Sequence, residues 1–168
     1  KKNFEKVHDD ALKSIRKALE NSKREYNLNV YFVAREKVTR SDFESIQLVI
    51  VLGGDGTLTS ISHNIGDSIL VMGVNSDPLD KDKDGSFGFY MGSRISTFES
   101  DLLQVLNGKA IVNELPRLQA EITSASGNSI KSDPALNDLL IANTHQYAPS
   151  KYILNRNGIS VKQSSSGL

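Results

Sequence analysis

Apolar residues recur every three or four positions near the start of the chain, with charged residues between them. The residues in this pattern are Phe4, Val7, Ala11, Leu12, Ile15, Ala18 and Leu19. This spacing brings side chains to one face of a helix. The pattern therefore predicts a surface helix over residues 4–19 with one buried stripe.

Three short apolar runs follow, at residues 28–33, 47–52 and 69–72, and each predicts a strand. A helix-like stretch begins at Leu58, between the second and third runs. Strands that alternate with helices are typical of a Rossmann-like parallel α/β sheet. In such sheets the ligand lies at the carboxyl ends of the strands.

Two further helices are expected from capping signals. Ser41 and Asp42 stand before Phe43, where they could cap a short helix. Residues 97–106 predict another helix, ended by Asn107–Gly108.

The sequence changes character after Gly108, where apolar residues fall in extended, roughly alternating segments. Gly127–Asn128 and Asn157–Gly158 are placed as hairpin turns. We therefore expect an α/β nucleotide-binding domain at residues 1–110. Residues 111–168 would be the beginning of a β-rich C-terminal domain, with antiparallel strands starting near Pro116.

Composition narrows the function classes. Twenty basic and twenty acidic residues cancel in a chain of 168, so no overall field attracts nucleic acid or an anionic membrane. The absence of cysteine excludes a disulfide framework and a Cys-liganded metal, which fits a reducing compartment. No stretch has the length of a membrane span. We expect neither nucleic acid nor a membrane as a partner, and a cytoplasmic or mitochondrial location.

The strongest chemical signal is the stretch Gly53–Thr57, GGDGT, at the end of the second apolar run. A P-loop would need a Lys-Ser/Thr pair after the last glycine, and a dinucleotide fingerprint would need glycine in place of Thr59. A tight turn without a ligand explains the glycines but not the carboxylate of Asp55 at its apex. The stretch therefore predicts a phosphate or nucleotide site.

Three motifs in order resemble the NAD kinase family: GGDGT, then GVNSDP at residues 73–78, then ALNDLLIA at residues 135–142. The last two look most like the branch that holds plant NADH kinase and the mitochondrial animal enzyme. The resemblance covers residues 49–168 and implies an NAD kinase/diacylglycerol kinase-like fold. The proline-glycine-threonine-asparagine stretch expected of lipid kinases is absent.

The resemblance implies transfer of a phosphoryl group from ATP to the 2′-hydroxyl of the adenosine ribose of NAD or NADH. Another phosphoryl donor, such as polyphosphate, stays open. Asp55 would accept the proton of this hydroxyl, and Mg²⁺ or another divalent cation would accompany ATP. The nucleotide- and acceptor-binding residues implied by the resemblance are Gly53, Gly54, Gly56, Thr57, Asn75, Asn137 and Asp138. Asp138 stands where the family often has glutamate, which changes the reach of the carboxylate. The resemblance also implies a homodimer or higher oligomer.

Alternatives stay open for these motifs. Residues 75–78 are also good turn chemistry, with Asx side chains bonding to nearby backbone. Asn137–Asp138 could cap the start of a helix. For the whole chain, the alternatives are a non-catalytic dinucleotide-binding module and a lipid kinase.

No metal-ligating residues are predicted. Residues 80–85 imitate the opening of a calcium-binding loop, but its closing acid would fall on Met91 and lysines alternate with the acids. The histidines are too widely separated to support a catalytic metal.

Both ends of the chain suggest a fragment of a kinase. A doubly wound sheet normally starts on a strand, whereas this chain opens on a helix. The family continues past a segment like residues 165–168 into a second stretch rich in glycine and threonine. We expect the 168 residues alone to turn nothing over.

Overall fold

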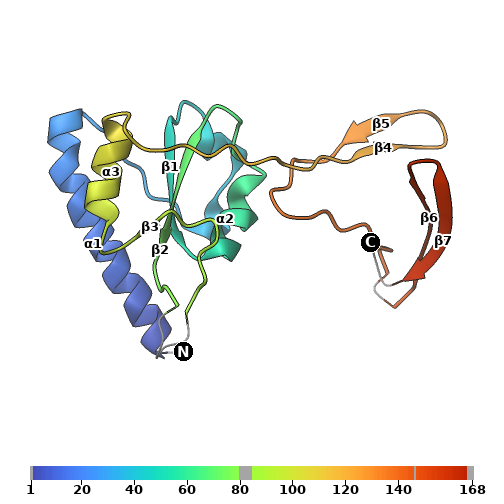
Figure 1. The fold of residues 1–168 in the computed structure, drawn as a ribbon, viewed down its shortest axis with the longest axis horizontal. Helices are drawn as coiled ribbons and strands as arrows, with labels where there is room; N and C mark the ends of the chain where they lie inside the picture. Colours follow the sequence, from blue (N-terminus) through green and yellow to red (C-terminus); the bar gives the residue numbers. More distant parts are fainter. Residues whose placement is uncertain (1, 80–84, 146, 166–168) are drawn as a thin grey trace. The chain divides into compact units, whose positions relative to one another are not determined.

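The structure, a computed structural model, describes residues 2–79, 85–145 and 147–165. The chain divides into two compact units, Lys1–Leu115 and Pro116–Leu168, and each is described by itself. The first holds α1 to α3 and β1 to β3, and the second holds β4 to β7 (Figure 1).

The predicted amphipathic helix is present as α1, Lys2–Tyr26, and extends beyond the predicted end. Ala11, Ile15 and Leu19 on its apolar stripe are buried. The helix ends where Asn27 adopts a left-handed conformation, with φ of 51°. The amide of Leu28 then bonds back to the carbonyl of Lys23 at 3.1 Å, as in a Schellman motif.

The expected parallel sheet is confirmed. It contains β1 (Leu48–Gly53), β2 (Leu70–Asn75) and β3 (Ser93–Arg94) in the order β1-β2-β3, all parallel. Helix α2, Asp55–Ser62, makes the crossover from β1 to β2.

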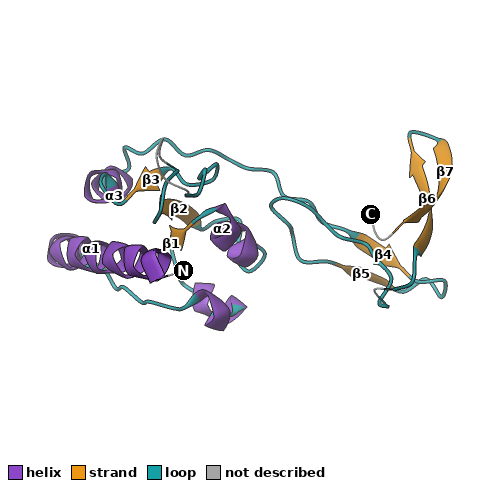
Figure 2. Cartoon of the chain, turned by 90° about the horizontal axis from the view of Figure 1, so that it is seen from below, coloured by secondary structure: helices purple, strands orange, loops and turns teal. Residues whose placement is uncertain are grey.

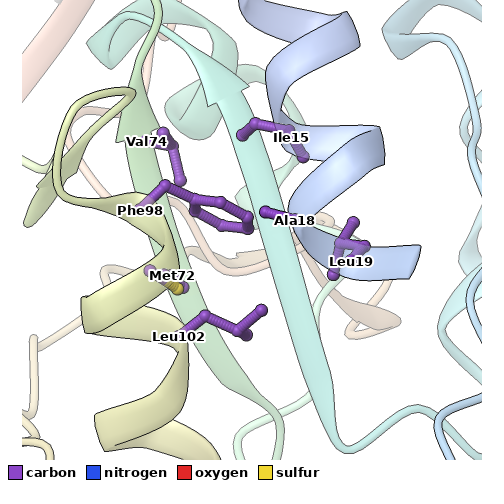
Figure 3. Close-up of a cluster of buried hydrophobic side chains, with 7 residues drawn as sticks. All are labelled: Ile15, Ala18, Leu19, Met72, Val74, Phe98 and Leu102. Atoms are coloured by element: carbon purple, nitrogen blue, oxygen red, sulfur yellow. The ribbon is translucent and has the colours of Figure 1, made fainter. Parts of the chain in front are cut away.

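Helices cover both faces of this sheet, as Figure 2 shows: α1 and α3 (Phe98–Leu106) lie on one face and α2 on the other. The apolar core lies between the sheet and the first pair of helices (Figure 3). Its buried residues are Ile15, Ala18, Leu19, Met72, Val74, Phe98 and Leu102. This packing holds the carboxyl ends of β1 and β2 in a fixed frame.

The strand predicted at residues 28–33 is wrong. The segment has no regular secondary structure and pairs with no strand of the described chain. Its apolar side chains find partners outside a sheet: Val30 packs against the core, and the guanidinium of Arg16 lies 4.0 Å from the ring centre of Phe32. β-branched and aromatic composition favours a pleated surface, but it does not supply a partner strand.

The short helix near Phe43 is a 3₁₀ turn, Arg40–Phe43, preceded by another, Arg35–Lys37. Ser41 and Asp42 lie inside this turn rather than before it, so the predicted cap position is wrong. The residue before the turn is Thr39, whose amide donates to the Asp42 carboxylate at 2.7 Å. A carboxylate at the third position of a helix can accept a hydrogen bond from the amide of the capping residue. Asp42 therefore acts from inside the turn, and Thr39 occupies the cap position.

Helix α3 begins at Phe98, one residue later than expected, and ends before Asn107–Gly108 as predicted, where Gly108 has φ of 66°. The carboxylate of Asp101 accepts hydrogen bonds from the hydroxyls of Ser93 and Thr97, both at 2.6 Å. These bonds tie the start of the helix to β3.

The second unit consists of two antiparallel hairpins, as expected. One pairs β4 (Glu121–Thr123) with β5 (Ser129–Lys131), and the other pairs β6 (Ser150–Arg156) with β7 (Ile159–Ser165).

Both predicted hairpin turns are confirmed. Gly127 has φ of 87°, and Asn157 and Gly158 have φ of 52° and 82°. Two consecutive positive φ angles fit a type I′ turn. Among the described residues of this unit, only Ser150 is buried. Across the described parts of both units, no helix is long and apolar enough to cross a membrane.

Candidate functional site

The GGDGT stretch forms a tight turn between β1 and α2. A Cβ atom at Gly53 would lie 2.4 Å from the hydroxyl oxygen of Thr57, and one at Gly54 would lie 2.7 Å from that of Ser86. The amide of Thr57 bonds to the carbonyl of Gly54 at 2.9 Å and starts the helix. Close packing against the branched side chain of Thr57 therefore favours glycine at position 53, whereas at position 54 the Ser86 hydroxyl would have to turn away, and Gly56 has open space around it.

Asp55 occupies the first position of α2, where the helix dipole favours a negative charge. Both of its carboxylate oxygens are held. The amide of Phe89 donates to Oδ2 at 2.9 Å, and the amide of Tyr90 donates to Oδ1 at 2.8 Å. The proposed base is thus fixed by backbone that lies more than 30 residues further along the chain.

The loop that supplies these amides turns sharply at Gly88, which has φ of 71°. The amide of Met91 closes the turn on the carbonyl of Gly88 at 3.1 Å. A Cβ atom at Gly88 would lie 2.4 Å from Nδ2 of Asn75. Only glycine fits this combination of conformation and close approach.

Asn75 lies next to the GGDGT turn because it pairs with Gly53 in the sheet. Asn75 is only 3% exposed, and its side chain bonds inside its own loop. Nδ2 donates to the carbonyl of Ser86 at 3.1 Å, and Oδ1 accepts from the amide of Asp77 at 3.2 Å. The second bond is the Asx turn that the sequence offered as an alternative for this motif.

The third motif lies in the second unit. Asn137 and Asp138 are exposed, and Nδ2 of Asn137 lies 3.3 Å from Oδ2 of Asp138. No helix follows them in the described chain, so the helix-cap alternative is wrong. The structure thus brings Gly53–Thr57 and Asn75 together in the first unit. Asn137 and Asp138 belong to the second unit.

Sequence reasoning missed the stretch Gly85–Tyr90, GSFGFY, which contacts both motifs of the first unit. A signal was present: two glycines interleaved with aromatic residues, shortly after Asn75. The stretch was overlooked because it acts through backbone amides and carbonyls, which have no side-chain signature.

Among residues that the structure describes, no group of three or more histidine, aspartate or glutamate side chains is placed to hold a metal ion. The acidic part of the rejected calcium-loop pattern, residues 80–84, lies outside the described residues.

Comparison with known proteins identifies the family. The model of the ATP-NAD kinase N-terminal domain matches residues 2–110. The chain is 32% identical over 133 residues to an NADH kinase of Arabidopsis thaliana, covering 71% of this chain and 39% of that protein. It is 31% identical over 129 residues to a probable NADH kinase of Oryza sativa subsp. japonica, covering 68% and 38%.

A bacterial relative is matched over most of the chain. The NAD kinase of Clostridium tetani is 27% identical over 166 residues, which is 96% of this chain and 56% of that protein. The chain spans about two fifths of the length of the plant relatives. Since the family domain covers well over half of the chain, the chain belongs to the ATP-NAD kinase family.

Proposed function

We propose that the protein containing this chain is an NAD(H) kinase, which transfers the γ-phosphoryl group of ATP to the 2′-hydroxyl of the adenosine ribose of NAD or NADH. The observation that carries this proposal is the Asp55 carboxylate, held at both oxygens beside a glycine turn in a chain of this family.

The reaction needs a base because a secondary alcohol is a poor nucleophile at neutral pH. Asp55 would accept the hydrogen bond of the 2′-hydroxyl and then its proton, while the hydroxyl oxygen bonds to phosphorus and the bond to ADP breaks. A carboxylate has about four acceptor positions, and the amides of Phe89 and Tyr90 take two of them. Acceptor capacity therefore remains for the substrate.

The surrounding residues divide the remaining tasks. Gly53, Gly54 and Gly56 would bring backbone amides to the phosphates, and Thr57 would line the same nucleotide site. Asn75, which the resemblance gives a hydrogen bond to the acceptor, would make it with the donor and acceptor capacity left beside its bonds to Ser86 and Asp77. Asn137 and Asp138 would hold the ribose and base of the acceptor by hydrogen bonds. The divalent cation, Mg²⁺ by preference, would arrive with ATP as part of the substrate.

The decisive experiment replaces Asp55 by asparagine in the full-length protein. The amide keeps the shape of the side chain but cannot take a proton, so turnover should fall by about 10²–10⁴-fold. The affinity for NAD should change little. Asp9→Asn, on the exposed side of α1, is the matched control and should keep full activity. Turnover of Asp55→Asn within tenfold of wild type would mean that Asp55 is not the base.

A second assay separates the alternatives by their acceptors. NAD, NADH and diacylglycerol compete for labelled phosphate from ATP, and the products are separated by thin-layer chromatography. Label in NADP or NADPH alone supports the proposal, and label in phosphatidic acid supports a lipid kinase. Dinucleotide binding without any labelled product would identify a non-catalytic module.

The cellular context is proposed on the same basis. The protein would work in the cytoplasm or the mitochondrion and assemble as a homodimer or higher oligomer. Light scattering after size-exclusion chromatography measures the assembly directly, and a monomeric mass would contradict it.

A further inference from the structure

We propose that the turn Gly88–Tyr90 is the positioning element of Asp55: it fixes the carboxylate in its reactive orientation through two backbone amides. This inference deepens the proposed function and rests on it. The turn was not part of any motif in the sequence, and its contribution comes from the main chain.

The geometry restrains the whole carboxylate. One hydrogen bond would leave the group free to rotate, whereas one donor on each oxygen fixes both its position and its plane. The distances, 2.9 Å from Phe89 and 2.8 Å from Tyr90, fall within the range of charge-assisted bonds. Phe89 is 73% exposed, so burial of its side chain is not what holds the contact.

The turn itself rests on rigid structure. Its conformation depends on Gly88 and on the buried amide of Asn75 behind it. A Cβ atom at Gly73, in the central strand β2, would lie 2.7 Å from the carbonyl oxygen of Tyr90 and 2.6 Å from Sδ of Met91. The turn is therefore packed directly against the sheet, and its amides point at Asp55.

Such a fixed group matters for the reaction rate rather than for substrate affinity. A preorganised base does not need to reorient as the transition state forms. Loss of the restraint should therefore lower kcat and leave KM nearly unchanged.

The test removes one amide at a time by replacing the residue with its α-hydroxy acid, which turns the N–H into an ester oxygen and keeps the side chain. In the full-length protein, replacement at Phe89 or at Tyr90 should lower kcat about tenfold to a hundredfold. KM for NAD and for ATP should stay within about threefold.

The matched control is the same replacement at Leu79. Its amide bonds to the carbonyl of Ser86 at 2.9 Å, in the same loop but not to Asp55. This ester should keep kcat within about threefold of wild type, since the lost bond goes to a backbone carbonyl and not to the Asp55 carboxylate. If the esters at Phe89 and Tyr90 also keep kcat while Asp55→Asn loses it, the turn is not the positioning element.

A second measurement does not depend on activity. In NMR spectra of the wild-type protein, the amide protons of Phe89 and Tyr90 should lie downfield and exchange slowly with solvent. In Asp55→Asn at least one of the two should move upfield and exchange faster, because one acceptor oxygen has become a donor. Unchanged shifts and exchange at both amides would overturn the contact. If the amide signals change in Asp55→Asn but the wild-type protein has no kinase activity, the proposed function is refuted while the contact between the turn and Asp55 stands.

Discussion

Two carboxylates of the first unit are held by amides in different ways. Asp42 is held by Thr39, three residues away, in a local turn. Asp55 is held by Phe89 and Tyr90, which are 34 and 35 residues away. The first arrangement serves a helical turn at the surface, and the second serves the proposed reaction.

The local contact predicts a pH dependence at Asp42. The Thr39 amide, and then the Thr39 hydroxyl, hold the pKa of Asp42 below its ordinary value of 3.8. A carboxyl with a depressed pKa in the folded state adds stability above its unfolded pKa, and this stability is lost as the pH falls through the folded value. The contribution should therefore be complete above about pH 5 and disappear in the acid range.

NMR titration of the Asp42 carboxyl carbon measures this pKa. Thr39→Ala removes the hydroxyl and keeps the amide, so the pKa should rise only part of the way to its ordinary value. Ser41→Ala serves as the control, because Ser41 contacts the Thr39 hydroxyl and not the carboxylate. A Thr39→Ala variant with an unchanged pKa would show that the hydroxyl contributes nothing.

A binding prediction concerns Asn137. If its side chain holds the acceptor, Asn137→Ala in the full-length protein should weaken NAD or NADH binding by about 1–3 kcal/mol, the cost of an unpaired polar partner. ATP binding should be nearly unchanged. Calorimetry measures both ligands, with Asn155→Ala on the exposed side of β6 as the control. An equal loss for both ligands would assign Asn137 a structural role.

At the scale of elements, the sequence predicted what depends on local pattern. Conformation is specified within a few residues in three kinds of segment: the periodic helix α1, the apolar strands β1 and β2, and the turn at Asn157–Gly158. The strand predicted at residues 28–33 was wrong because strand pairing depends on a partner that is distant in the sequence. The fold class could be predicted because it follows from local sequence patterns alone.

The candidate site also has a part that local sequence predicts and a part that depends on distant contacts. Asp55 and Asn75 could be predicted as site residues because their side chains stand out in recognisable motifs, and the structure places Asn75 beside Gly53 of the turn that leads to Asp55. Gly88–Tyr90 was missed because amide donors belong to every residue except proline. Their direction becomes visible only when the loop is folded.

The packing of β2 against the loop predicts a stability effect. Gly73→Ala would place a Cβ atom 2.7 Å from the backbone carbonyl oxygen of Tyr90, and overpacking of this kind costs about 1–3 kcal/mol. Gly92→Ala is the matched control, because a Cβ atom there meets nothing within 4 Å. Urea denaturation of the two variants compares their free energies of unfolding. Equal free energies of unfolding would show that the loop around Tyr90 and Met91 accommodates the extra methyl group without loss of stability.

At the scale of the whole molecule, the two units differ in how they are stabilised. The first has a core of seven buried residues between sheet and helices. The described part of the second buries only Ser150, and Ile153 and Ile159 of its hairpin β6–β7 are 65% and 68% exposed. A two-stranded hairpin without a covered face is marginal in water.

Hydrogen exchange measured by mass spectrometry should therefore separate the units in the 168-residue chain. Amides of β1 and β2 should exchange slowly, near the rate of global unfolding, whereas those of β6 and β7 should exchange faster by orders of magnitude. Peptides from α1 serve as an internal control for the first unit. Equal protection of β6–β7 would show that contacts beyond its own pairing stabilise this hairpin.

The bonds from Phe89 and Tyr90 to Asp55 also set an order of events during synthesis. The ribosome adds roughly 5–20 residues per second, so the carboxylate is made roughly two to seven seconds before the amide of Tyr90. In that interval the nascent chain carries the complete GGDGT sequence without the backbone that orients its aspartate. A chain cut short before Phe89 would thus carry the motif intact, with its base unrestrained by these two amides.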